Sequence, residues 1–440
     1  MAVSSVTKTG SRESFNQSSV QSRNFAHLYA DVAWFGLAFG STLSFLPVFA
    51  TRLGAAGWQI GLLSAGPALV SILFTLPAGR WLVSHSLGPA VAKTAFLHRL
   101  GYFLLIPLPL LLPPEMQVWA VILLTLLMAI PGTALMVGFN ALLATTVAPE
   151  YRGKVVGRRN ALLAATIMIS FVLSGWILDW MSFEWGYMAV FTMGALGGAL
   201  STYHLSKINP PPTPQFLGRP TQDMAQPGRG VGISGSMPHR FTVGLRLLMQ
   251  WAPSRDSLLS QISPGYWRVM MAFFLFHFTQ MLPAALFPMF WVREARLTDG
   301  EIGWVNGIFY LTMLLAAPLL GPMTRRWGNY RLTVVNAILL AIYPLLTALS
   351  RDLSLLLVTG AIGGVVWAIL AGAHANRLLE HIPDDTRPAH LAVYNLAFNA
   401  ALLGGTLLGP FLGDWLGLRE ALLLVFVLRT GSGLALARWG

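Results

Sequence analysis

The sequence has no cysteine and few charged residues among its 440 positions. Without cysteine, the chain can form no disulfide, no thiolate metal site and no cysteine nucleophile. Charged residues make up 10% of the chain, against about 25% in soluble proteins. Too few charges are present to cover the surface of a soluble protein of this size, which argues against an ordinary soluble enzyme. A Gly-x-x-x-x-Gly-Lys-Ser/Thr motif is also missing from the sequence, which excludes ATP-driven transport by this chain.

Hydrophobic residues make up 55% of the chain and gather in runs of about 20 residues or more, the length that crosses a bilayer as a helix. These runs do not show the alternating pattern of membrane β-strands. The sequence therefore predicts an all-α integral membrane protein with twelve transmembrane helices and no metal or other cofactor. The predicted spans lie near 28–50, 57–81, 90–112, 118–147, 158–182, 184–206, 266–292, 301–325, 330–350, 352–381, 390–417 and 418–437.

A stretch rich in proline and glycine separates the first six spans from the last six. The predicted domains are a polar N-terminus at 1–27, a six-helix bundle at 28–206, a linker at 207–265 and a second bundle at 266–440. Within the linker, 241–252 has one apolar helical face. This pattern fits an interfacial helix lying on the membrane, and it fits equally a helix that packs on protein.

The basic residues predict the orientation of the chain. If the N-terminus is cytoplasmic, all but five of the 29 Lys and Arg residues fall on the cytoplasmic side. Because short cytoplasmic loops carry an excess of Lys and Arg, both termini are predicted to be cytoplasmic. The cations are scattered between apolar runs, so they indicate membrane topology and not a nucleic-acid partner.

The two predicted bundles repeat one another weakly. Residues of the same type recur about 240 positions apart, near the ends of corresponding spans. A same-direction repeat of six spans predicts two bundles related by an axis along the membrane normal, with a central cleft between them. The matched pairs are Pro47 and Pro288, Arg52 and Arg293, Asp179 and Asp414, and Trp180 and Trp415.

This six-plus-six organisation resembles the major facilitator superfamily of secondary transporters. The family's loop motif, Gly-x-x-x-Asp-Arg/Lys-x-Gly-x-x-Arg/Lys, is matched between spans 8 and 9 at Gly321, Arg326, Gly328 and Arg331, with Arg325 in place of the acid. The loop between spans 2 and 3 keeps glycines and Arg80 but has lost the acid and the spacing. The resemblance implies two six-helix bundles that alternate access to a small-molecule site, and a monomer as the functional unit.

A second pattern, Gly405-x-x-x-Gly409-Pro410-x-x-Gly413, resembles the glycine-proline motif of drug/proton antiporters, although it falls on span 11 and not on span 5. Small residues at this spacing also allow close helix packing, which is the more common meaning of such a pattern.

Polar residues in the middle of spans are the candidates for a transport site, since lipid does not favour them. His277 and Gln280 share one face of span 7, and Trp367 and His374 share one face of span 10. Asn140 lies on span 4. In the resembled family, helices 1, 4, 7 and 10 line the cavity, which favours Asn140, His277, Gln280, Trp367 and His374 as the substrate cavity. A histidine satisfied by a neighbouring helix is the alternative for His277.

The loop cations Arg325, Arg326 and Arg331 predict a cytoplasmic gate that closes on acids of the other bundle. Glu150 is the first candidate partner and Asp31 the second. Asp31 lies near the cytoplasmic end of its span, where it can also start a helix or carry a proton. No Lys or Arg was placed in mid-span, which favours a neutral or amphiphilic solute over a dianion.

The predicted function is secondary transport of a small solute, with protons as possible coupling ions, in a bacterial inner membrane. Proton-driven multidrug efflux is the alternative within this class. A receptor or membrane enzyme is the alternative outside it, but it would require a reactive cluster that the sequence does not show.

Overall fold

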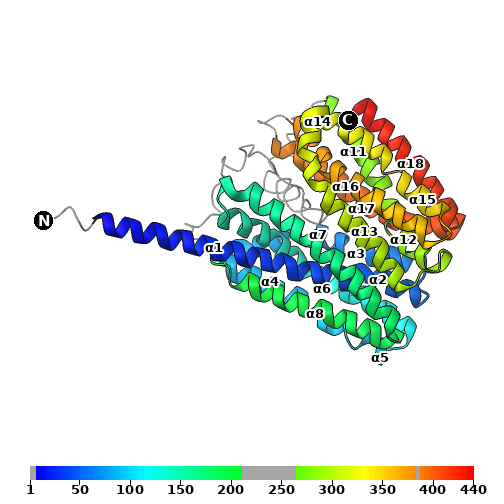
Figure 1. Ribbon diagram of the computed structural model, residues 1–440, viewed down its shortest axis with the longest axis horizontal. Helices are drawn as coiled ribbons and strands as arrows, with labels where there is room; N and C mark the ends of the chain where they lie inside the picture. Colours follow the sequence, from blue (N-terminus) through cyan, green and yellow to red (C-terminus); the bar gives the residue numbers. More distant parts are fainter. Residues whose placement is uncertain (1–5, 211–263, 383–386) are drawn as a thin grey trace.

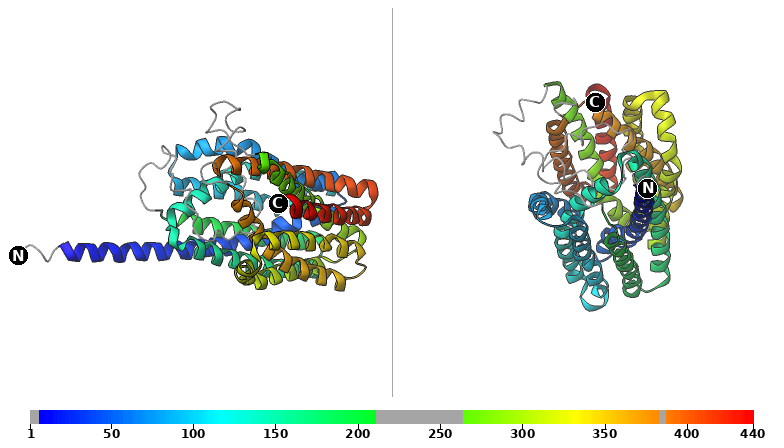
Figure 2. Two further views of the ribbon diagram at one scale, coloured as in Figure 1. Left: turned by 90° about the horizontal axis from the view of Figure 1, so that it is seen from above. Right: turned by 90° about the vertical axis from the view of Figure 1, so that its left-hand side faces the viewer.

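The computed structural model describes residues 6–210, 264–382 and 387–440, and these residues form helices without β-strands. Most of the predicted linker, including 241–252, lies outside the described residues. Figure 1 shows the helices of the first half and those of the second half as two groups packed side by side, and Figure 2 shows the same division from two further directions.

The first group has six spans, of which the first and third are interrupted. Its helices α1 and α2 flank a π-helical turn, η1, and form one span. The helix α1 begins at Val6, inside the stretch predicted as a polar terminus. The elements are α1 (Val6–Ala38), η1 (Phe39–Leu43), α2 (Ser44–Arg52), α3 (Gly57–Val83), α4 (Leu87–Leu105), α5 (Leu108–Leu111), α6 (Pro114–Thr146), α7 (Pro149–Trp180) and α8 (Phe183–Ser206).

The second group repeats this plan, again with an interrupted first span. Its elements are α11 (Pro264–Met281), η4 (Leu282–Ala284), α12 (Leu286–Met289), η5 (Phe290–Glu294), α13 (Asp299–Ala316), η6 (Ala317–Leu319), α14 (Leu320–Leu339), α15 (Ile342–Leu349), α16 (Leu353–Glu380), α17 (Arg387–Leu416) and α18 (Leu418–Trp439).

Ten stretches of the described helices are long and apolar enough to cross a membrane. One of them, Asp299–Leu349, holds two spans, because Gly328 breaks α14 with a φ of 76°, a backbone conformation that favours glycine. With that stretch divided and α8 added, the described residues contain the twelve predicted spans. Gly328 is the glycine of the loop motif between spans 8 and 9, so its conformation explains why the motif has a glycine there.

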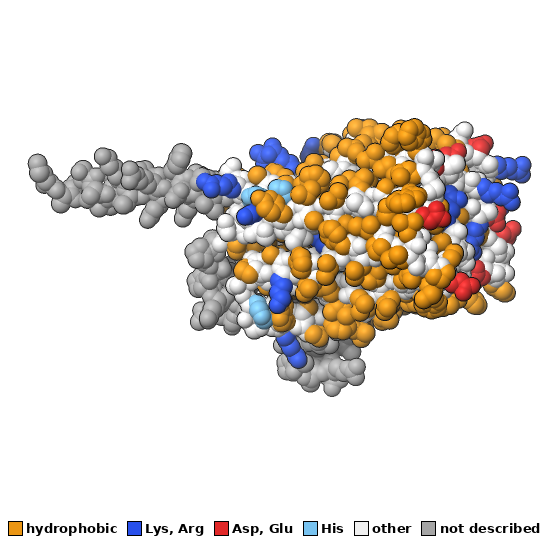
Figure 3. Space-filling view, turned by 90° about the horizontal axis from the view of Figure 1, so that it is seen from below, with side chains coloured by type: hydrophobic (Ala, Val, Ile, Leu, Met, Phe, Trp, Pro, Cys, Tyr) orange, Lys and Arg blue, Asp and Glu red, His pale blue; other side chains and the backbone are white. Residues whose placement is uncertain are grey.

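The lateral surface of the molecule is apolar. Figure 3 shows hydrophobic side chains over the middle of the molecule, with charged side chains gathered toward its ends. Most of the exposed tryptophans lie near the helix ends opposite the chain termini, and Trp180 and Trp415, which the repeat relates, are 80% and 73% exposed. Trp side chains concentrate at membrane interfaces, so this belt marks one boundary of the bilayer. The protein is an integral membrane protein with multiple spans.

The hydrophobic core divides differently at the two ends of the molecule. The end opposite the chain termini is called the outer end here, and the end at which α18 finishes is called the inner end. Toward the outer end both groups share one core, in which Phe45 and Phe49 of α2 belong to the same cluster as Phe290 and Ile302. Toward the inner end each group has a core of its own. The two halves are therefore joined near the outer end.

Candidate functional site

The two predicted histidines meet inside the second half. His277 of α11 and His374 of α16 are 7% and 4% exposed. Their Nε2 atoms lie 3.1 Å apart, and His277 Nε2 also lies 2.9 Å from the hydroxyl of Tyr394 on α17. The sequence therefore singled out two residues that contact each other, but it did not indicate Tyr394 as their partner.

The other three predicted cavity residues do not contribute to the contact between the two histidines. Trp367 packs against the apolar core of the second half. The side-chain Oε1 of Gln280 is buried without a hydrogen-bond partner among the described residues. Asn140 is half-buried on α6, next to Phe139. A role for these five residues in substrate binding stays a prediction.

A cavity of about 510 Å³ lies in the first half, along α1, α3, α4, α6 and α7. On α1 and α2 its wall runs from Asp31 past Phe35 and Phe39 to Pro47, which at 1.5 Å per residue is a length of about 24 Å. Leu402 of α17 contributes to the wall from the other half. This volume is within the range of about 300–1,000 Å³ that holds drug-sized ligands.

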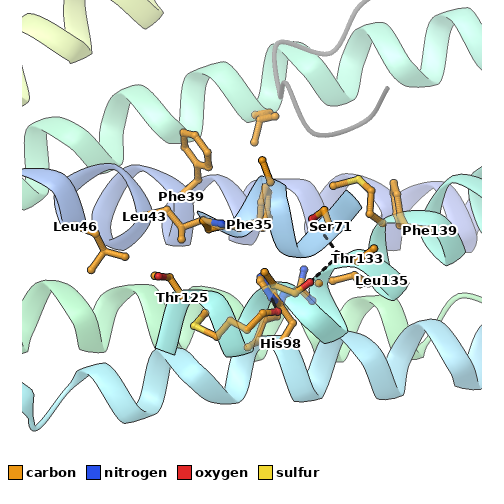
Figure 4. A pocket seen from close by; sticks show the side chains of 18 of the residues that line it. Phe35, Phe39, Leu43, Leu46, Ser71, His98, Thr125, Thr133, Leu135 and Phe139 are labelled. Atoms are coloured by element: carbon orange, nitrogen blue, oxygen red, sulfur yellow. Dashed lines mark hydrogen bonds between the residues drawn. The ribbon is translucent and has the colours of Figure 1, made fainter. Parts of the chain in front are cut away.

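Figure 4 shows the labelled side chains of the cavity. Phe35, Phe39, Leu43 and Leu46 form an apolar side along the first span. On the facing helices, Thr133 of α6 donates a hydrogen bond to Ser71 of α3 over 3.0 Å. The middle and far parts of the cavity are therefore mostly apolar, with few polar groups.

A buried cluster of charges lines the end of the cavity at Asp31. The Asp31 carboxylate lies 3.7 Å from Arg99 Nη2 and 3.4 Å from Arg159 Nη2. The hydroxyl of Ser201 donates a hydrogen bond to the same carboxylate. The side chains of Asp31 and Arg99 are only 6% and 5% exposed, and that of Arg159 is 11% exposed. Ion pairs with so little exposure are screened much less than pairs on the surface.

The sequence did not predict this cluster, because Arg99 and Arg159 count among the basic residues of the cytoplasmic side. Arg99 is instead close to the centre of the span Leu87–Leu111. The expectation that no cation lies in mid-span is therefore wrong. A signal was present, since Arg99 is followed directly by a long apolar run at 100–112. Arg99 by itself leaves the predicted orientation unchanged, because the excess of basic residues on one side is large.

Arg429 of α18 is a second mid-span cation that the loop count misplaced, and the helix breaks explain its position. Its Nε donates to the carbonyl of Thr279 over 3.2 Å, and its Nη1 donates to that of Leu340 over 3.2 Å. Four residues later in the chain are Pro283 and Pro344, which have no N–H to donate to these carbonyls. Arg429 therefore supplies donors where two prolines interrupt the helices.

The predicted gate residues are apart in this structure. Arg325, Arg326 and Arg331 are exposed, and within the described part of the chain none has an ion pair. Glu150 is exposed at the start of α7, whereas Asp31 is engaged by Arg99 and Arg159. The halves are joined near the outer end, and the predicted gate would form only where the inner ends meet. The gate therefore stays a prediction.

The outer ends of the halves are connected by polar contacts. Arg52 of α2 pairs with Asp299 of α13, with Nη2 at 3.1 Å, and also donates to the carbonyl of Leu297. Its repeat mate, Arg293, donates to the carbonyl of Ala55 in the first half. We call these contacts of Arg52 and Arg293 the outer latch. Each arginine reaches across to the opposite half, so the latch follows the twofold repeat of the sequence.

Asp179 adds a helix cap beside the outer latch. Its carboxylate accepts hydrogen bonds from the Thr298 hydroxyl at 2.8 Å and from the Gly300 N–H at 2.9 Å, at the start of α13. A negative charge is stabilising at a helix N-terminus, where N–H groups have no partner within the helix. Its repeat mate Asp414 lies against Gly57, the first residue of α3. Both carboxylates therefore lie at the N-terminus of a helix in the other half.

Glycines bring the helices of the two halves close together below the latch. A Cβ placed on Gly303 of α13 would lie 2.6 Å from the carbonyl oxygen of Phe171 on α7. The glycine-proline pattern of span 11 has a similar use within the second half, where a Cβ on Gly405 would lie 2.5 Å from the carbonyl oxygen of Phe278. Close packing therefore accounts for that pattern.

Two six-helix halves that are joined at one end and have a cavity beside their interface define the architecture of a two-bundle membrane transporter. The sequence model described as Major Facilitator Superfamily matches residues 32–264 and 269–439. The chain belongs to this superfamily, as the motif between spans 8 and 9 predicted.

Known proteins agree with this assignment. The chain is 22% identical over 125 residues to Multidrug resistance protein 1 of Bacillus subtilis (strain 168), a match that covers 28% of this chain and 31% of the relative. Among solved structures, a bacterial homologue of the iron transporter ferroportin in an inward-facing state aligns with a TM-score of 0.68 and 13% identity, covering 95% of this chain and 98% of the other.

The xylose transporter XylE from E. coli, in a partially occluded inward open conformation, aligns with a TM-score of 0.66 and 13% identity, covering 94% and 97% of the two chains. At such identities the structures show a shared fold. The chain matches about a third of the length of the curated relative, so its solute is not given by these comparisons.

Proposed function

We propose that the protein is a secondary transporter that moves a small solute by alternating access, with the solute bound in the cavity of the first half. The observation that carries this proposal is the cavity of about 510 Å³, which is lined by residues from all the spans of one half and touched by Leu402 of the other. A site in contact with both halves is altered when they rock against each other.

The described state is then the one that opens toward the inner end. Support comes from the core, which the halves share near the outer end and do not share near the inner end. The outer latch closes the opposite side. From the distribution of basic residues, we place the inner end and both termini in the cytoplasm of a bacterial cell, with the protein in the inner membrane.

The predicted cytoplasmic gate belongs to the opposite state. Arg325, Arg326 and Arg331 are exposed cations at the inner end of the second half, and Glu150 is an exposed acid at the inner end of α7. When the halves close at the inner end, we propose that Glu150 meets these arginines. Asp31 is a weaker candidate because two other arginines already contact it.

The histidine pair is the candidate for coupling to protons. An unperturbed imidazole titrates near pH 6.5, as is typical of groups that respond to physiological pH. The Nε2 atoms of His277 and His374 lie within hydrogen-bond distance of each other. We propose that the pair couples proton movement to transport and that the solute itself binds in the other half.

The absence of cysteine makes a direct test available. Cysteines introduced at Gly57 and Asp414 join the two halves at the outer end, because a Cβ at Gly57 would lie 2.9 Å from Asp414 Cγ. In proteoliposomes, oxidation of this pair should stop solute transport, and reduction should restore it. Either single cysteine is the matched control. Unchanged transport after complete cross-linking would contradict alternating access around this interface.

A second candidate is multidrug efflux, because the curated relatives include proteins named for multidrug resistance. Cells that express the protein should then retain less of several unrelated dyes, and Ser71→Trp, which places a bulky indole in the cavity, should abolish the effect. Export of a single chemical class would favour the narrower transporter.

A further inference from the structure

The charges around the cavity do not balance. Among the described residues that line it, Asp31 is the one acid, whereas Arg99 and Arg159 are both cations. One carboxylate therefore faces two guanidinium groups, and the cluster has an excess of one positive charge. An uncompensated charge buried in a membrane protein is costly, so it calls for a partner.

One donor of the two arginines has no hydrogen-bond partner among the described residues. Arg99 donates through Nη1 to the Thr202 hydroxyl at 3.1 Å, and Arg159 donates through Nε to the Leu28 carbonyl at 3.2 Å. The Nε of Arg99 is buried and has no hydrogen-bond partner among the described residues. Because Arg99 is 4% exposed and lines the cavity, this is an unpartnered polar group at the edge of a ligand-sized space.

The aromatic rings near the arginines hold the guanidinium groups in place. Arg159 lies over the ring of Phe139, with its Cζ 4.6 Å from the ring centroid, and Arg99 lies 6.0 Å from that of Phe35. Cation–π contacts of this kind fix the planes of the guanidinium groups. A planar guanidinium held in this way is suited to a carboxylate, which it can bind through two hydrogen bonds.

Beyond the charged end, the wall of the cavity becomes apolar. Phe39, Leu43, Leu46 and Pro47 continue along the first span, and Met128 faces the cavity from α6. The cavity therefore has one cationic end and a long apolar body. A neutral solute would leave the extra positive charge of the cluster uncompensated, and a cation would increase it. A dianion would overcompensate the cluster by one negative charge.

Resting on the proposed function, we propose that the transported solute is an amphipathic organic monoanion. Its acidic group binds at Arg159 and Arg99, and its apolar body lies along Phe35, Phe39 and Leu43 toward Pro47. This proposal replaces the sequence-based preference for a neutral or amphiphilic solute, which assumed that no cation lies in mid-span.

Three probes with one skeleton and different charges test the solute class. They are 1-pyrenebutyrate, 1-pyrenebutanol and 1-pyrenebutylamine, with binding to the full chain measured by fluorescence in dodecyl maltoside. We expect saturable binding of the acid at least tenfold tighter than that of the alcohol, and no saturable binding of the amine. Equal affinities for acid and alcohol would overturn the monoanion proposal.

Variants that change single charges test whether the preference for the acid over the alcohol depends on the arginines of the cavity. Arg159→Gln should reduce the tenfold ratio of acid to alcohol to below threefold, whereas Arg159→Lys should retain most of it. Arg438→Gln changes an exposed cation on α18 and is the matched control. A ratio that survives in Arg159→Gln would overturn the assignment of the acidic group.

Failure of the proposed site is distinguishable from failure of the solute class. Ser71→Trp should abolish binding of both the acid and the alcohol, because it places a bulky indole in the cavity. If both still bind to this variant as they do to the parent chain, the probes bind elsewhere, and the cavity is not the site. If Ser71→Trp loses binding of both probes but the parent chain shows no preference for the acid, the cavity is the site and the monoanion proposal is wrong.

Discussion

In the first half the buried cations Arg99 and Arg159 meet a carboxylate beside a cavity, whereas in the second half the buried cation Arg429 meets backbone carbonyls. The two halves have matching residues at their outer ends, including Arg52 and Arg293. Their interiors have diverged. The comparison indicates that the repeat preserves how the halves meet, while the chemistry for a solute is concentrated in one of them.

The largest expected effect comes from removing the acid of the first half. Asp31→Ala leaves two buried guanidinium groups without their ion-pair partner, so we expect the free energy of unfolding to fall by about 3–5 kcal/mol. The measurement is an unfolding titration in mixed micelles. Removing one cation in addition, as in Asp31→Ala with Arg99→Met, should recover part of the loss. A loss below about 1 kcal/mol in Asp31→Ala would show that the cluster is hydrated.

A smaller loss is expected in the second half. Arg429→Met removes the side-chain donors to the carbonyls of Thr279 and Leu340 but also removes a buried charge, so we expect a net loss of about 2 kcal/mol. Pro283→Ala returns an N–H to the carbonyl of Thr279. In that background Arg429→Met should cost less, which a double-mutant cycle measures. Strictly additive effects would contradict the link between the arginine and the proline.

The outer latch allows a comparison between repeat mates. Arg52 meets the charged Asp299, whereas Arg293 meets the carbonyl of Ala55. Because Arg52 is 25% exposed, its pair is screened in part, and we expect Arg52→Ala to favour opening of the outer end by about 1 kcal/mol, more than Arg293→Ala. The measurement uses a single cysteine in place of Leu46 and an impermeant thiol reagent added from the outer side. The cysteine should react faster in the Arg52→Ala variant than in the Arg293→Ala variant. Equal reaction rates in the two variants would contradict the prediction that Arg52 contributes more than Arg293 to closing the outer end.

The smallest effect on binding is expected at the histidine pair. His277→Gln lies outside the cavity residues, so the affinity for 1-pyrenebutyrate should change less than twofold, while the pH dependence of transport should change. Phe274→Leu, on the same helix, is a control of similar size without a titratable group. A large loss of affinity would instead place His277 at the solute, as the sequence predicted. An unchanged pH profile would contradict its coupling role.

The predictable part of the fold was the part governed by length and hydropathy. The spans, their division into six and six, and the family motif with Gly328 are confirmed, since each depends on residues close together in the chain. The candidate site was harder to predict. His277 and His374 could be predicted because polar residues stand out in apolar runs. Arg99 was assigned to a loop because basic residues beside a span are normally topological signals.

The sequence by itself determined the solvent, the number of spans and the family, because a bilayer imposes a hydrophobic length on every helix whatever its neighbours are. The tertiary structure decided which polar groups meet. Asp31, Arg99 and Arg159 are on three different spans, and Arg429 is about 90 and 150 residues from the carbonyls that it contacts. Helical periodicity shows which face of a span a residue occupies, but the partner of that face depends on how the helices pack, and local sequence does not encode that packing.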